Sequence, residues 1–280
     1  MAVLDIDGTL VNNFKQVSRR TVNVISRLES KGVHVCLCTG RNIASMLPVA
    51  RKLKLETPCI CIDGSIMYDL KKKKIIYESV LPNAVMRDVI DIARARSVNI
   101  EAVTWSRYIW HISNRSIENV DVYKAGSFNL PESVIYSLLK YRFGVRYEKS
   151  LDKFYRIKDQ IYQIVAMGEE KDIKLIQSDL ELHDNKDIRS RILWGNQLFI
   201  TGKNVSKSHG LKILAEHFGV GMEEAVAIGD DLNDLDMIEA AGMGVAMGNA
   251  NESVKAVSGH VTKTNEEDGA ALALEKFFFS

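Results

Sequence analysis

The chain has 280 residues, 46% of them hydrophobic and 26% charged, so it can bury a large core as one large domain or two ordinary ones. Its 37 Lys and Arg residues nearly balance its 36 Asp and Glu residues, which gives no support to a nucleic-acid partner or a membrane-surface role. The N-terminal residues carry no basic lead and no long apolar span, so we expect neither a signal peptide nor a membrane helix, and a cytoplasmic protein.

The first apolar run of the chain ends in two carboxylates, Asp5 and Asp7, and a glycine, Gly8, follows them. In an extended strand this spacing puts both acidic side chains on the same side of the backbone. Two negative charges this close repel each other unless a cation or a proton lies between them, which favours a metal and acid–base site. The structural alternative is a strand followed by an acidic turn, because Asp and Gly are ordinary turn residues.

The segment that follows alternates between helix and strand patterns with short connections. The apolar spacing predicts, in order, a helix over 18–30, a strand over 33–38, a helix over 43–53 and a strand over 59–62. This alternation indicates a parallel α/β sheet, in which ligands bind at the carboxyl ends of the strands. Asp5, Thr39 and Asp63 all fall at such ends.

The four cysteines occur as two pairs, Cys36 with Cys38 and Cys59 with Cys61. A four-thiolate metal site is one interpretation, but a spacing of one intervening residue is shorter than zinc sites use. Each pair also alternates within an apolar run that is typical of a buried strand. We therefore expect the cysteines to be small buried core residues.

The pattern changes after residue 65. Two short strand-like runs over 66–80 flank Lys71-Lys72-Lys73-Lys74, which predicts a solvated hairpin turn. Beyond Pro82 the expected elements are helices over 85–96, 131–140 and 171–180 and strands over 100–103, 108–112, 161–167 and 188–193. This mixture indicates a separate α+β module inserted into the chain. Its aromatic stretch from Trp105 to His111 fits either packing within a hairpin or contact with a substrate.

The parallel pattern resumes after Phe199. Ser206 is the expected N-cap of a helix over 207–218, and a strand over 225–228 then ends in Gly229-Asp230-Asp231-Leu232-Asn233-Asp234. A helix over 235–241 and a strand over 244–247 follow. The predicted fold is α/β: a doubly wound, Rossmann-like parallel sheet core formed by residues 1–81 and 195–280, with an inserted α+β cap domain over 82–194.

This fold gathers polar residues from distant parts of the sequence at one edge of the sheet. They are Asp5, Asp7, Thr39, Gly40, Lys207 and the 230–234 acidic cluster, with Asp63 and Asn249 as further candidates. Several carboxylates without His or Cys suit a hard cation with oxygen ligands, and Mg²⁺ fits best when a substrate phosphate completes its coordination shell. Zinc is disfavoured for the same reason.

A carboxylate nucleophile, a Lys, a Thr-Gly turn and Mg²⁺ together equip a site for phosphoryl transfer. Attack by an aspartate on phosphorus gives an aspartyl phosphate, and the metal and Lys207 would screen the repulsion between the two anions. Asp7 is near enough to protonate the leaving oxygen and then to activate water. The sequence has neither a Gly-x-x-x-x-Gly-Lys loop nor a Gly-x-Gly-x-x-Gly turn, which disfavours nucleotide-dependent kinases and dinucleotide enzymes.

At this point the chain resembles the haloacid dehalogenase (HAD) superfamily of aspartate-nucleophile phosphatases, and within it the Cof-type hydrolases with a large inserted α/β cap. Four short motifs appear in the expected order, and the resemblance extends over most of the core. They are Asp5-Ile6-Asp7-Gly8-Thr9, Cys38-Thr39-Gly40-Arg41, Lys207 and Gly229-Asp230-Asp231-Leu232-Asn233-Asp234, with Ala246-Met247-Gly248-Asn249-Ala250 and Asn265-Glu266-Glu267-Asp268-Gly269 downstream.

The resemblance implies a role for each matched residue. It implies that Asp5 is the nucleophile, Asp7 the acid and base, Thr39 the phosphoryl-holding residue and Lys207 the charge-neutralising residue. Substrate binding would fall to Thr39, Gly40, Arg41 and Lys207. The implied Mg²⁺ residues are Asp5, Asp7 through its backbone carbonyl, Asp230, and the supporting Asn233 and Asp234.

Two departures from the family pattern leave the substrate open. Asp63 stands where relatives commonly have Asn, which adds a negative charge near the phosphate site, and Phe199 stands where an acidic residue is frequent. Our main hypothesis is a Mg²⁺-dependent phosphatase that acts on small phosphorylated metabolites such as sugar phosphates, as a monomer or weak homodimer. The alternatives are a phosphomutase of the same superfamily, a phospho-acceptor module without turnover, and a catalytically silent binding protein. The inserted cap is expected to decide the substrate.

Overall fold

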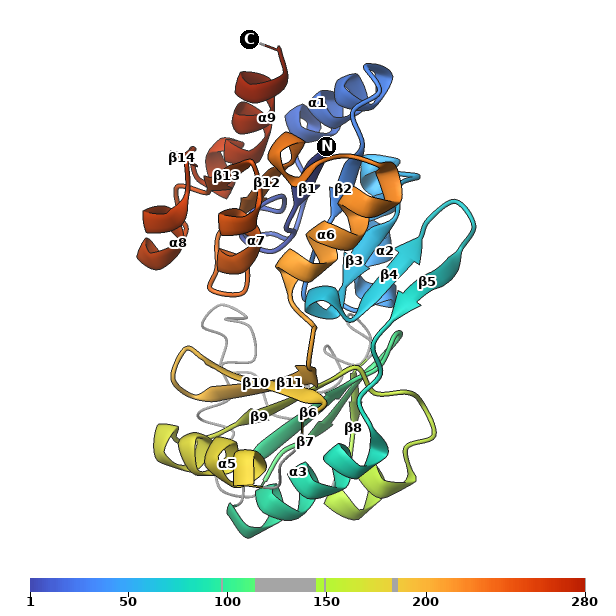
Figure 1. The fold of residues 1–280 in the computed structure, drawn as a ribbon, viewed down its shortest axis with the longest axis vertical. Helices are drawn as coiled ribbons and strands as arrows, with labels where there is room; N and C mark the ends of the chain where they lie inside the picture. The colour runs from blue at the N-terminus through green and yellow to red at the C-terminus, as the bar shows by residue number, and fades with distance from the viewer. Residues whose placement is uncertain (97, 114–144, 149, 183–185, 280) are drawn as a thin grey trace. The chain divides into compact units, whose positions relative to one another are not determined.

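The computed structural model describes residues 1–96, 98–113, 145–148, 150–182 and 186–279, which form two compact units (Figure 1). The first unit comprises Met1–Glu78 and Val205–Ser280, and the second comprises Ser79–Asn204. The second unit is therefore an insertion in the chain of the first. Each unit has a hydrophobic core of its own.

The first unit is built on a sheet of five parallel strands in the order β14-β13-β12-β1-β2. These strands are β1 (Ala2–Leu4), β2 (Val35–Leu37), β12 (Val226–Gly229), β13 (Met243–Ala246) and β14 (His260–Val261). The helices of this unit are α1 (Arg19–Ser30), α2 (Ile43–Leu53), α6 (Lys207–Phe218), α7 (Leu235–Ala240), α8 (Glu252–Val257) and α9 (Gly269–Phe279), with 3-10 helices η1 (Ile62–Gly64), η3 (Met222–Glu224) and η4 (Asn265–Glu267). The chain adds strands on both sides of β1, so the predicted α/β core is confirmed.

Helices α6 and α7 pack on one face of this sheet (Figure 1). Leu211 and Leu214 of α6 and Met237 of α7 are fully buried in the same cluster as Val3 of β1. Burial of each such side chain stabilises the fold by roughly 1.5–3 kcal/mol. This packing fixes the direction of α6, whose first residue is Lys207.

The register of the parallel strands decides which residues meet at the carboxyl edge. Leu4, the last residue of β1, lies opposite both Leu37 of β2 and Ile228 of β12, so the three strands end at nearly the same level. The polar residues that follow these strands leave the sheet at this edge: Asp5, Thr39 and Asp230.

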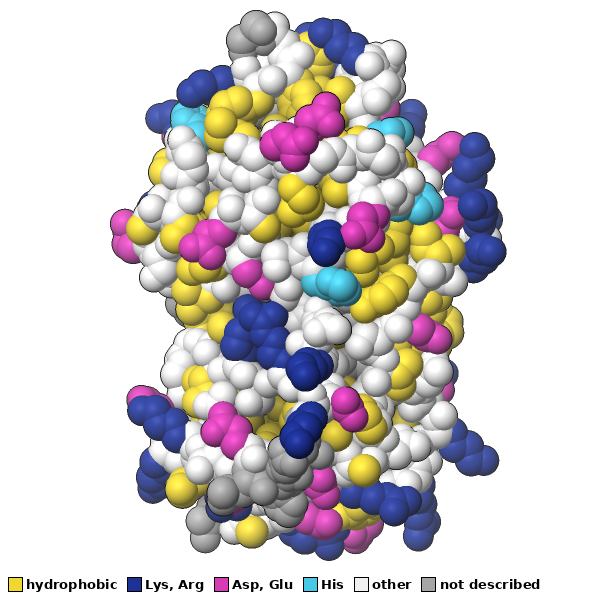
Figure 2. Space-filling view, in the orientation of Figure 1, with side chains coloured by type: hydrophobic (Ala, Val, Ile, Leu, Met, Phe, Trp, Pro, Cys, Tyr) yellow, Lys and Arg dark blue, Asp and Glu magenta, His cyan; other side chains and the backbone are white. Residues whose placement is uncertain are grey.

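The third predicted strand of the core takes part in two kinds of pairing. Strand β3 (Cys59–Cys61) joins the parallel sheet through one bridge, between Cys38 and Ile60. It also begins a small antiparallel sheet with β4 (Ile66–Asp69) and β5 (Lys74–Glu78). The turn between β4 and β5 exposes Lys71 to Lys74, which project at the edge of the molecule (Figure 2), so the predicted solvated hairpin turn is confirmed.

The four cysteines, Cys36, Cys38, Cys59 and Cys61, are fully buried free thiols. Burial raises the pKa of each thiol, to about 12 for Cys59. A buried, protonated thiol is a poor nucleophile and a poor metal ligand. The interpretation of these residues as small core side chains is confirmed.

The second unit is built on a six-stranded sheet in the order β10-β11-β9-β6-β7-β8, antiparallel except between β7 and β8. Its strands are β6 (Asn99–Val103), β7 (Tyr108–His111), β8 (Val145–Tyr147), β9 (Gln163–Met167), β10 (Ile188–Leu193) and β11 (Gln197–Gly202). Helices α3 (Asn83–Arg96) and α5 (Glu170–Leu182) pack with the sheet in one core, and η2 (Leu151–Arg156) is a 3-10 helix. The helix predicted over 131–140 lies outside the described residues.

The boundary between the units differs from the one drawn from the sequence. We expected the core to resume at residue 195, but the second unit continues to Asn204. The cause is β11, which pairs antiparallel with both β9 and β10 and so completes the sheet of the second unit. Phe199, after which we expected the parallel pattern to resume, lies in this strand.

A helix that crosses a bilayer needs about 20 predominantly apolar residues. Within the part of the chain that the structure describes, no helix meets this requirement for length and apolar character.

Candidate active site

Two side chains of opposite charge are buried together at the carboxyl edge of the parallel sheet. Asp5 is 5% exposed and Lys207 is 1% exposed. Lys207 Nζ donates to Asp5 Oδ1 at 2.7 Å and also to Asp234 Oδ1. Helix α6 presents Lys207 here because Ser206 caps it, accepting the backbone N–H of His209 at 3.1 Å.

This ion pair shifts the protonation equilibria of both partners. Burial raises the pKa of Asp5 well above its usual range. The Lys207 ammonium opposes this increase, and the Asp234 carboxylate adds to it. Burial alone would lower the pKa of Lys207, but the carboxylates of Asp234 and Asp5 raise it well above its usual range. Lys207 is therefore a permanent positive charge in the site.

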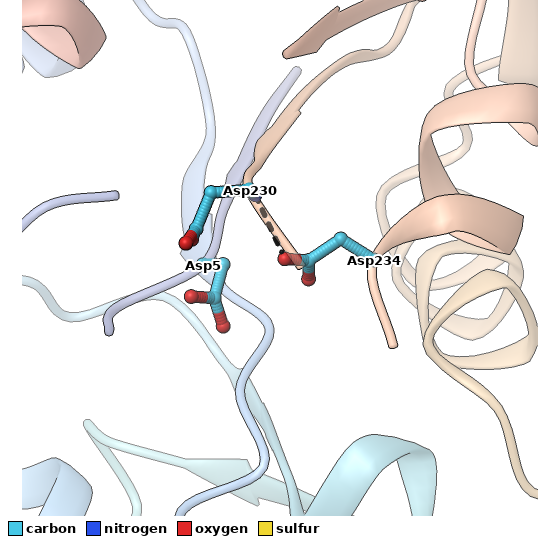
Figure 3. Close-up of side chains that lie close together, drawn as sticks. All are labelled: Asp5, Asp230 and Asp234. Atoms are coloured by element: carbon cyan, nitrogen blue, oxygen red, sulfur yellow. Dashed lines mark hydrogen bonds between the residues drawn. The ribbon is translucent and has the colours of Figure 1, made fainter. Parts of the chain in front are cut away.

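Asp5 lies beside two other carboxylates, Asp230 and Asp234 (Figure 3). One ligand atom from each of the three side chains lies within 4.8 Å of the other two. Asp234 is fully buried, and its Oδ2 accepts the backbone N–H groups of Asp230 at 3.0 Å and Asp231 at 3.1 Å. These bonds curl the loop after β12, so that Asp230 and Asp234 face Asp5.

Asp230 has partners that orient its carboxylate. Thr9 Oγ1 donates to Asp230 Oδ1 at 2.8 Å. Burial raises the pKa of Asp230 to about 7, with a further contribution from Asp234 and an opposing one from the Thr9 hydrogen bond. Three crowded carboxylates of this kind suit a hard divalent cation with oxygen ligands, and a cation would relieve their mutual repulsion.

The turn after Asp7 approaches Asp230 so closely that it has room only for glycine. Gly8 has a φ of +79°, and a Cβ added to it would lie 2.0 Å from Asp230 Oδ2. The Gly8 carbonyl accepts Asn249 Nδ2 at 2.8 Å, and Asn249 Oδ1 accepts the backbone N–H of Asn265 at 2.9 Å. The two downstream motifs thus brace the turn that carries the first acidic pair.

Asp7 lies in a different environment from Asp5. Arg41 binds it through two hydrogen bonds, Nε to Oδ2 at 2.6 Å and Nη2 to Oδ1 at 2.8 Å. Lys15 Nζ donates to Oδ1 at 2.8 Å. Burial would raise the pKa of Asp7, but Arg41 and Lys15 together lower it to about 2. In this arrangement Asp7 is ionised and can accept a proton.

The Thr39-Gly40-Arg41 turn connects β2 to the N-terminus of α2. Thr39 is 1% exposed, and its Oγ1 accepts the backbone N–H of Arg41 at 3.2 Å. Asn42 caps α2 by accepting the backbone N–H of Ser45 at 3.0 Å. A glycine-containing turn at a helix N-terminus is suited to binding an anion such as a phosphoryl group.

Asp63 and Asn233, which come from different loops, meet at the same edge. Asn233 Nδ2 donates to Asp63 Oδ1 at 2.9 Å, and Asp63 is 6% exposed. The structure therefore places the amide of Asn233 on Asp63, whereas the group of potential metal-binding carboxylates comprises Asp5, Asp230 and Asp234.

Two residues that contact the site, Thr9 and Lys15, were not predicted from the sequence. Thr9 lies within the first motif, and its hydroxyl at the end of a sharp turn was a signal for the contact with Asp230. Lys15 had no such signal, because it reaches Asp7 through a local loop. The backbone N–H of Asn12 donates to the Gln16 carbonyl at 3.0 Å, the backbone N–H of Lys15 donates to the Asn12 carbonyl at 2.8 Å, and Lys15 has a φ of +58°.

The aromatic stretch of the second unit divides into buried and exposed parts. Trp110 is 6% exposed and donates through Nε1 to Glu101, whereas Trp105 in the turn between β6 and β7 is 47% exposed. Burial raises the pKa of Glu101 to about 7, and the hydrogen bond from Trp110 opposes this shift. Phe199 on β11 makes an edge contact with Trp194, with ring centroids 5.7 Å apart. Trp110 and Phe199 thus pack within this unit.

A doubly wound sheet with a buried Lys–Asp pair and an acidic cluster at its carboxyl edge is an arrangement suited to phosphoryl transfer. The sequence profile of the family described as haloacid dehalogenase-like hydrolase matches residues 2–274, so the chain belongs to this family. The predicted family and the predicted class of enzyme, a hydrolase with phosphatase relatives, are confirmed.

The relatives match the chain over nearly its whole length. It is similar to the 5-amino-6-(5-phospho-D-ribitylamino)uracil phosphatase YitU of Bacillus subtilis (strain 168), with 28% identity over 99% of this chain and 97% of the relative. It is also similar to the pyridoxal phosphate phosphatase YbhA of Escherichia coli (strain K12), with 27% identity over 96% of this chain and 94% of the relative. A solved structure of a haloacid dehalogenase-like hydrolase from Bacteroides thetaiotaomicron has a TM-score of 0.79 and 28% identity, covering 99% of this chain and 98% of that chain.

Proposed function

We propose that the protein is a Mg²⁺-dependent phosphatase that hydrolyses small phosphorylated metabolites, sugar phosphates among them, through an aspartyl-phosphate intermediate. The observation that carries this proposal is the buried contact of Lys207 with both Asp5 and Asp234 beside the acidic cluster. A solitary buried ion pair would be a costly structural element. At the carboxyl edge of a parallel sheet, the Lys207–Asp5 pair is suited to a reaction between two anions, the carboxylate and a phosphate.

Asp5 and Asp230 are the carboxylates that we assign to the metal, with Asp234 in a supporting role. Both oxygens of Asp234 are engaged, Oδ1 by Lys207 and Oδ2 by two backbone N–H groups, so this residue orients the other two. The bound Mg²⁺ would neutralise charge on the phosphoryl oxygens. Burial raises the pKa values of Asp5 and Asp230, and the nearby carboxylates add to the shift, which a divalent cation would oppose.

Asp5 is the nucleophile in this proposal. Lys207 holds its Oδ1 at 2.7 Å, so we assign the attack on phosphorus to Oδ2. The new bond joins Asp5 to phosphorus, and the bond from phosphorus to the ester oxygen breaks. Lys207 reduces the repulsion between the carboxylate and the phosphoryl group, and Thr39 and Gly40 hold that group at the N-terminus of α2.

Asp7 supplies and removes protons in the two halves of the reaction. It protonates the ester oxygen that leaves and then takes a proton from the water that hydrolyses the aspartyl phosphate. Because Arg41 and Lys15 keep Asp7 ionised here, we infer that both cations turn to the phosphoryl oxygens when the substrate binds, and that Asp7 then takes up from solvent the proton that it gives to the leaving oxygen. The same planar guanidinium can bind a carboxylate or a phosphate with two hydrogen bonds.

The relatives support a small phosphate monoester as the substrate. The two phosphatases described above are named for a phosphorylated ribitylamino pyrimidine and for pyridoxal phosphate. Both names describe a phosphate on a small organic molecule. We therefore place the substrate of this protein in the same chemical class.

The test is phosphate release from a panel of sugar phosphates, nucleotides and cofactor phosphates with Mg²⁺. We expect turnover by the wild type that disappears on addition of EDTA and in the isosteric variant Asp5→Asn. Asp69→Asn is the matched control, because Asp69 is a buried carboxylate on β4 that accepts the backbone N–H of Lys72. Absence of turnover on every substrate by a folded, Mg²⁺-binding protein would contradict the proposal. Formation of a sugar-phosphate isomer without phosphate release would support a phosphomutase instead.

A further inference from the structure

Asp63 is held at the carboxyl edge by an unusual backbone conformation. Ile62 and Asp63 both have a φ of +50°, the left-handed region that a β-branched residue such as Ile rarely adopts. Backbone bonds fix this turn, with the N–H of Ile62 on the Arg41 carbonyl at 3.0 Å and the N–H of Asp63 on the Thr39 carbonyl at 3.1 Å. The two bonds attach the Ile62-Asp63 turn to the Thr39-Gly40-Arg41 segment. A strained backbone conformation of this kind persists only where surrounding contacts hold it in place.

The carboxylate of Asp63 lies against the turn that we assign to the phosphoryl group. A methyl group added to Gly40 would lie 3.2 Å from Asp63 Oδ1 and 3.5 Å from Oδ2. Asp63 also contributes to the raised pKa of Lys207, after the larger contributions of Asp234 and Asp5. The negative charge of Asp63 and the positive charge of Lys207 therefore both act on an anion bound beside Gly40.

Asp63 makes the charge of this edge more negative than phosphoryl binding requires. Asp5, Asp230 and Asp234 already place three carboxylates around Lys207, and Asp63 adds a fourth. With Mg²⁺ bound, the positive charges of the metal, Lys207, Arg41 and Lys15 equal the negative charges of Asp5, Asp7, Asp230, Asp234 and Asp63. Asp63 therefore cancels the net positive charge that a phosphate dianion would otherwise meet at this edge.

We propose that Asp63 is a specificity-determining residue whose fixed negative charge weakens the binding of fully ionised phosphate beside Gly40. This inference rests on the proposed phosphatase function and identifies the residue that sets how tightly the site holds its inorganic phosphate product. The charge raises the free energy of bound phosphate and so favours its release after hydrolysis. It also makes the affinity for a substrate depend more on the organic part of the molecule than on its phosphate.

The test compares inorganic phosphate binding by the wild type and by Asp63→Asn, with Mg²⁺ present. Asn has the same shape, tolerates a left-handed backbone and retains an oxygen that can accept Asn233 Nδ2, so the variant isolates the charge. We expect the dissociation constant of phosphate, measured by calorimetry, and its inhibition constant to fall about tenfold or more, since a unit charge this close acts strongly at an effective dielectric constant of about 20. The KM of the substrate falls with them, and kcat stays the same or decreases as phosphate release slows.

A second variant and a stability measurement separate this role from a structural one. Asp63→Gly removes the side chain and suits the left-handed backbone, so it too should bind phosphate more tightly. In EDTA, Asp63→Asn should leave the melting temperature nearly unchanged, because the amide oxygen can still accept Asn233 Nδ2, whereas loss of a structural contact would lower it. Asp69→Asn is the control for loss of a buried carboxylate elsewhere in the first unit.

The possible outcomes distinguish this inference from the proposed function. Unchanged or weaker phosphate binding by both Asp63 variants, with normal turnover by the wild type, would overturn the role of Asp63 alone. A wild-type protein that neither turns over phosphate monoesters nor binds phosphate with Mg²⁺ would overturn the proposed function, and this inference with it.

Discussion

Arg41 binds both carboxylate oxygens of Asp7, at 2.6 and 2.8 Å, whereas Asp5, two residues earlier, has Lys207 on one oxygen and two carboxylates nearby. The two environments move the two pKa values in opposite directions, below the usual range for Asp7 and above it for Asp5. These directions, found without metal or substrate, are the reverse of those that a nucleophile and a general acid need, so the proposed mechanism requires a cation at Asp5 and the departure of Arg41 from Asp7. The contact with Arg41 is therefore the feature that distinguishes the two acids of the first motif.

Replacement of this guanidinium by an ammonium should separate charge from geometry. We expect Arg41→Lys to raise KM by about tenfold or more and to lower kcat, because Lys cannot bind a carboxylate or a phosphate with two parallel hydrogen bonds. Loss of one charge-assisted bond from this partly buried pair should also reduce the free energy of unfolding by about 1–2 kcal/mol. Steady-state kinetics and urea unfolding would measure both effects. Arg51→Lys, on the exposed side of α2, is the control, and equal behaviour of the two variants would contradict the role of Arg41.

Removal of the buried ammonium should destabilise the protein more than removal of a surface one. Lys207→Met leaves Asp5 and Asp234 buried without their shared partner, and loss of one partner of a buried ion pair typically costs about 3–5 kcal/mol. Urea unfolding of the metal-free protein would measure this loss, and turnover should disappear. Lys212→Met, exposed on the same helix, should change stability by less than about 0.5 kcal/mol. If the two variants unfolded at the same urea concentration, Lys207 would not be the charge that balances these acids.

The elements around the site could be predicted from the sequence because local signals define them. Ser206 and Gly219 bracket helix α6 as an N-cap and a C-terminal glycine, and the structure has the helix at Lys207–Phe218, as expected. The strands that carry the acidic motifs are short, apolar and followed by Gly or Asp, which makes their ends recognisable. The parallel order of the strands then placed Asp5, Thr39 and Asp230 at one edge.

Other features depend on contacts between distant residues and could not be predicted in this way. Strand β11 resembles a core strand in its apolar pattern, but it pairs with β9 and β10, and pairing partners leave no local signal. Arg41 binds Asp7, a contact between residues of two different motifs that neither motif signals. Lys15 reaches the same carboxylate only because a loop folds back over it. Such contacts follow from the tertiary fold, which composition and periodicity do not specify.

The acidic cluster predicts that the metal-free protein is less stable at higher pH. The pKa of Asp230 is about 7 in the folded protein, against an ordinary value of 3.8, so between these values the folded state binds more protons than the unfolded chain. Stability must therefore fall as the pH rises through this window. In EDTA, we expect a melting temperature a few degrees higher at about pH 5 than at about pH 8.

Mg²⁺ and Asp230→Asn should each reduce this pH dependence by a different route, and the remainder comes from groups such as Glu101, whose pKa burial also raises to about 7. The cation would stabilise the ionised carboxylate, and the amide does not titrate in this range. Thermal unfolding at both pH values, with EDTA or with Mg²⁺, would show this. A pH dependence in EDTA that persists unchanged in Asp230→Asn would mean that another group causes it.

Gly8 offers a test of the packing between the first and last acidic motifs. It shares a φ of +79° with Gly32, but a Cβ at Gly8 would lie 2.0 Å from Asp230 Oδ2, whereas a Cβ at Gly32 would have nothing within 4 Å. Gly32→Ala should therefore reduce the free energy of unfolding by only about 1–2 kcal/mol, because a residue with a Cβ is strained in the left-handed region, and it should bind Mg²⁺ normally. Gly8→Ala has the same strain and must also displace Asp230, so we expect a larger loss of stability and at least about tenfold weaker Mg²⁺ binding. Urea unfolding and calorimetric Mg²⁺ titration of the two variants would measure these effects. Equal effects in the two would show that the turn can move away from Asp230, and that the close approach of Gly8 does not position this carboxylate.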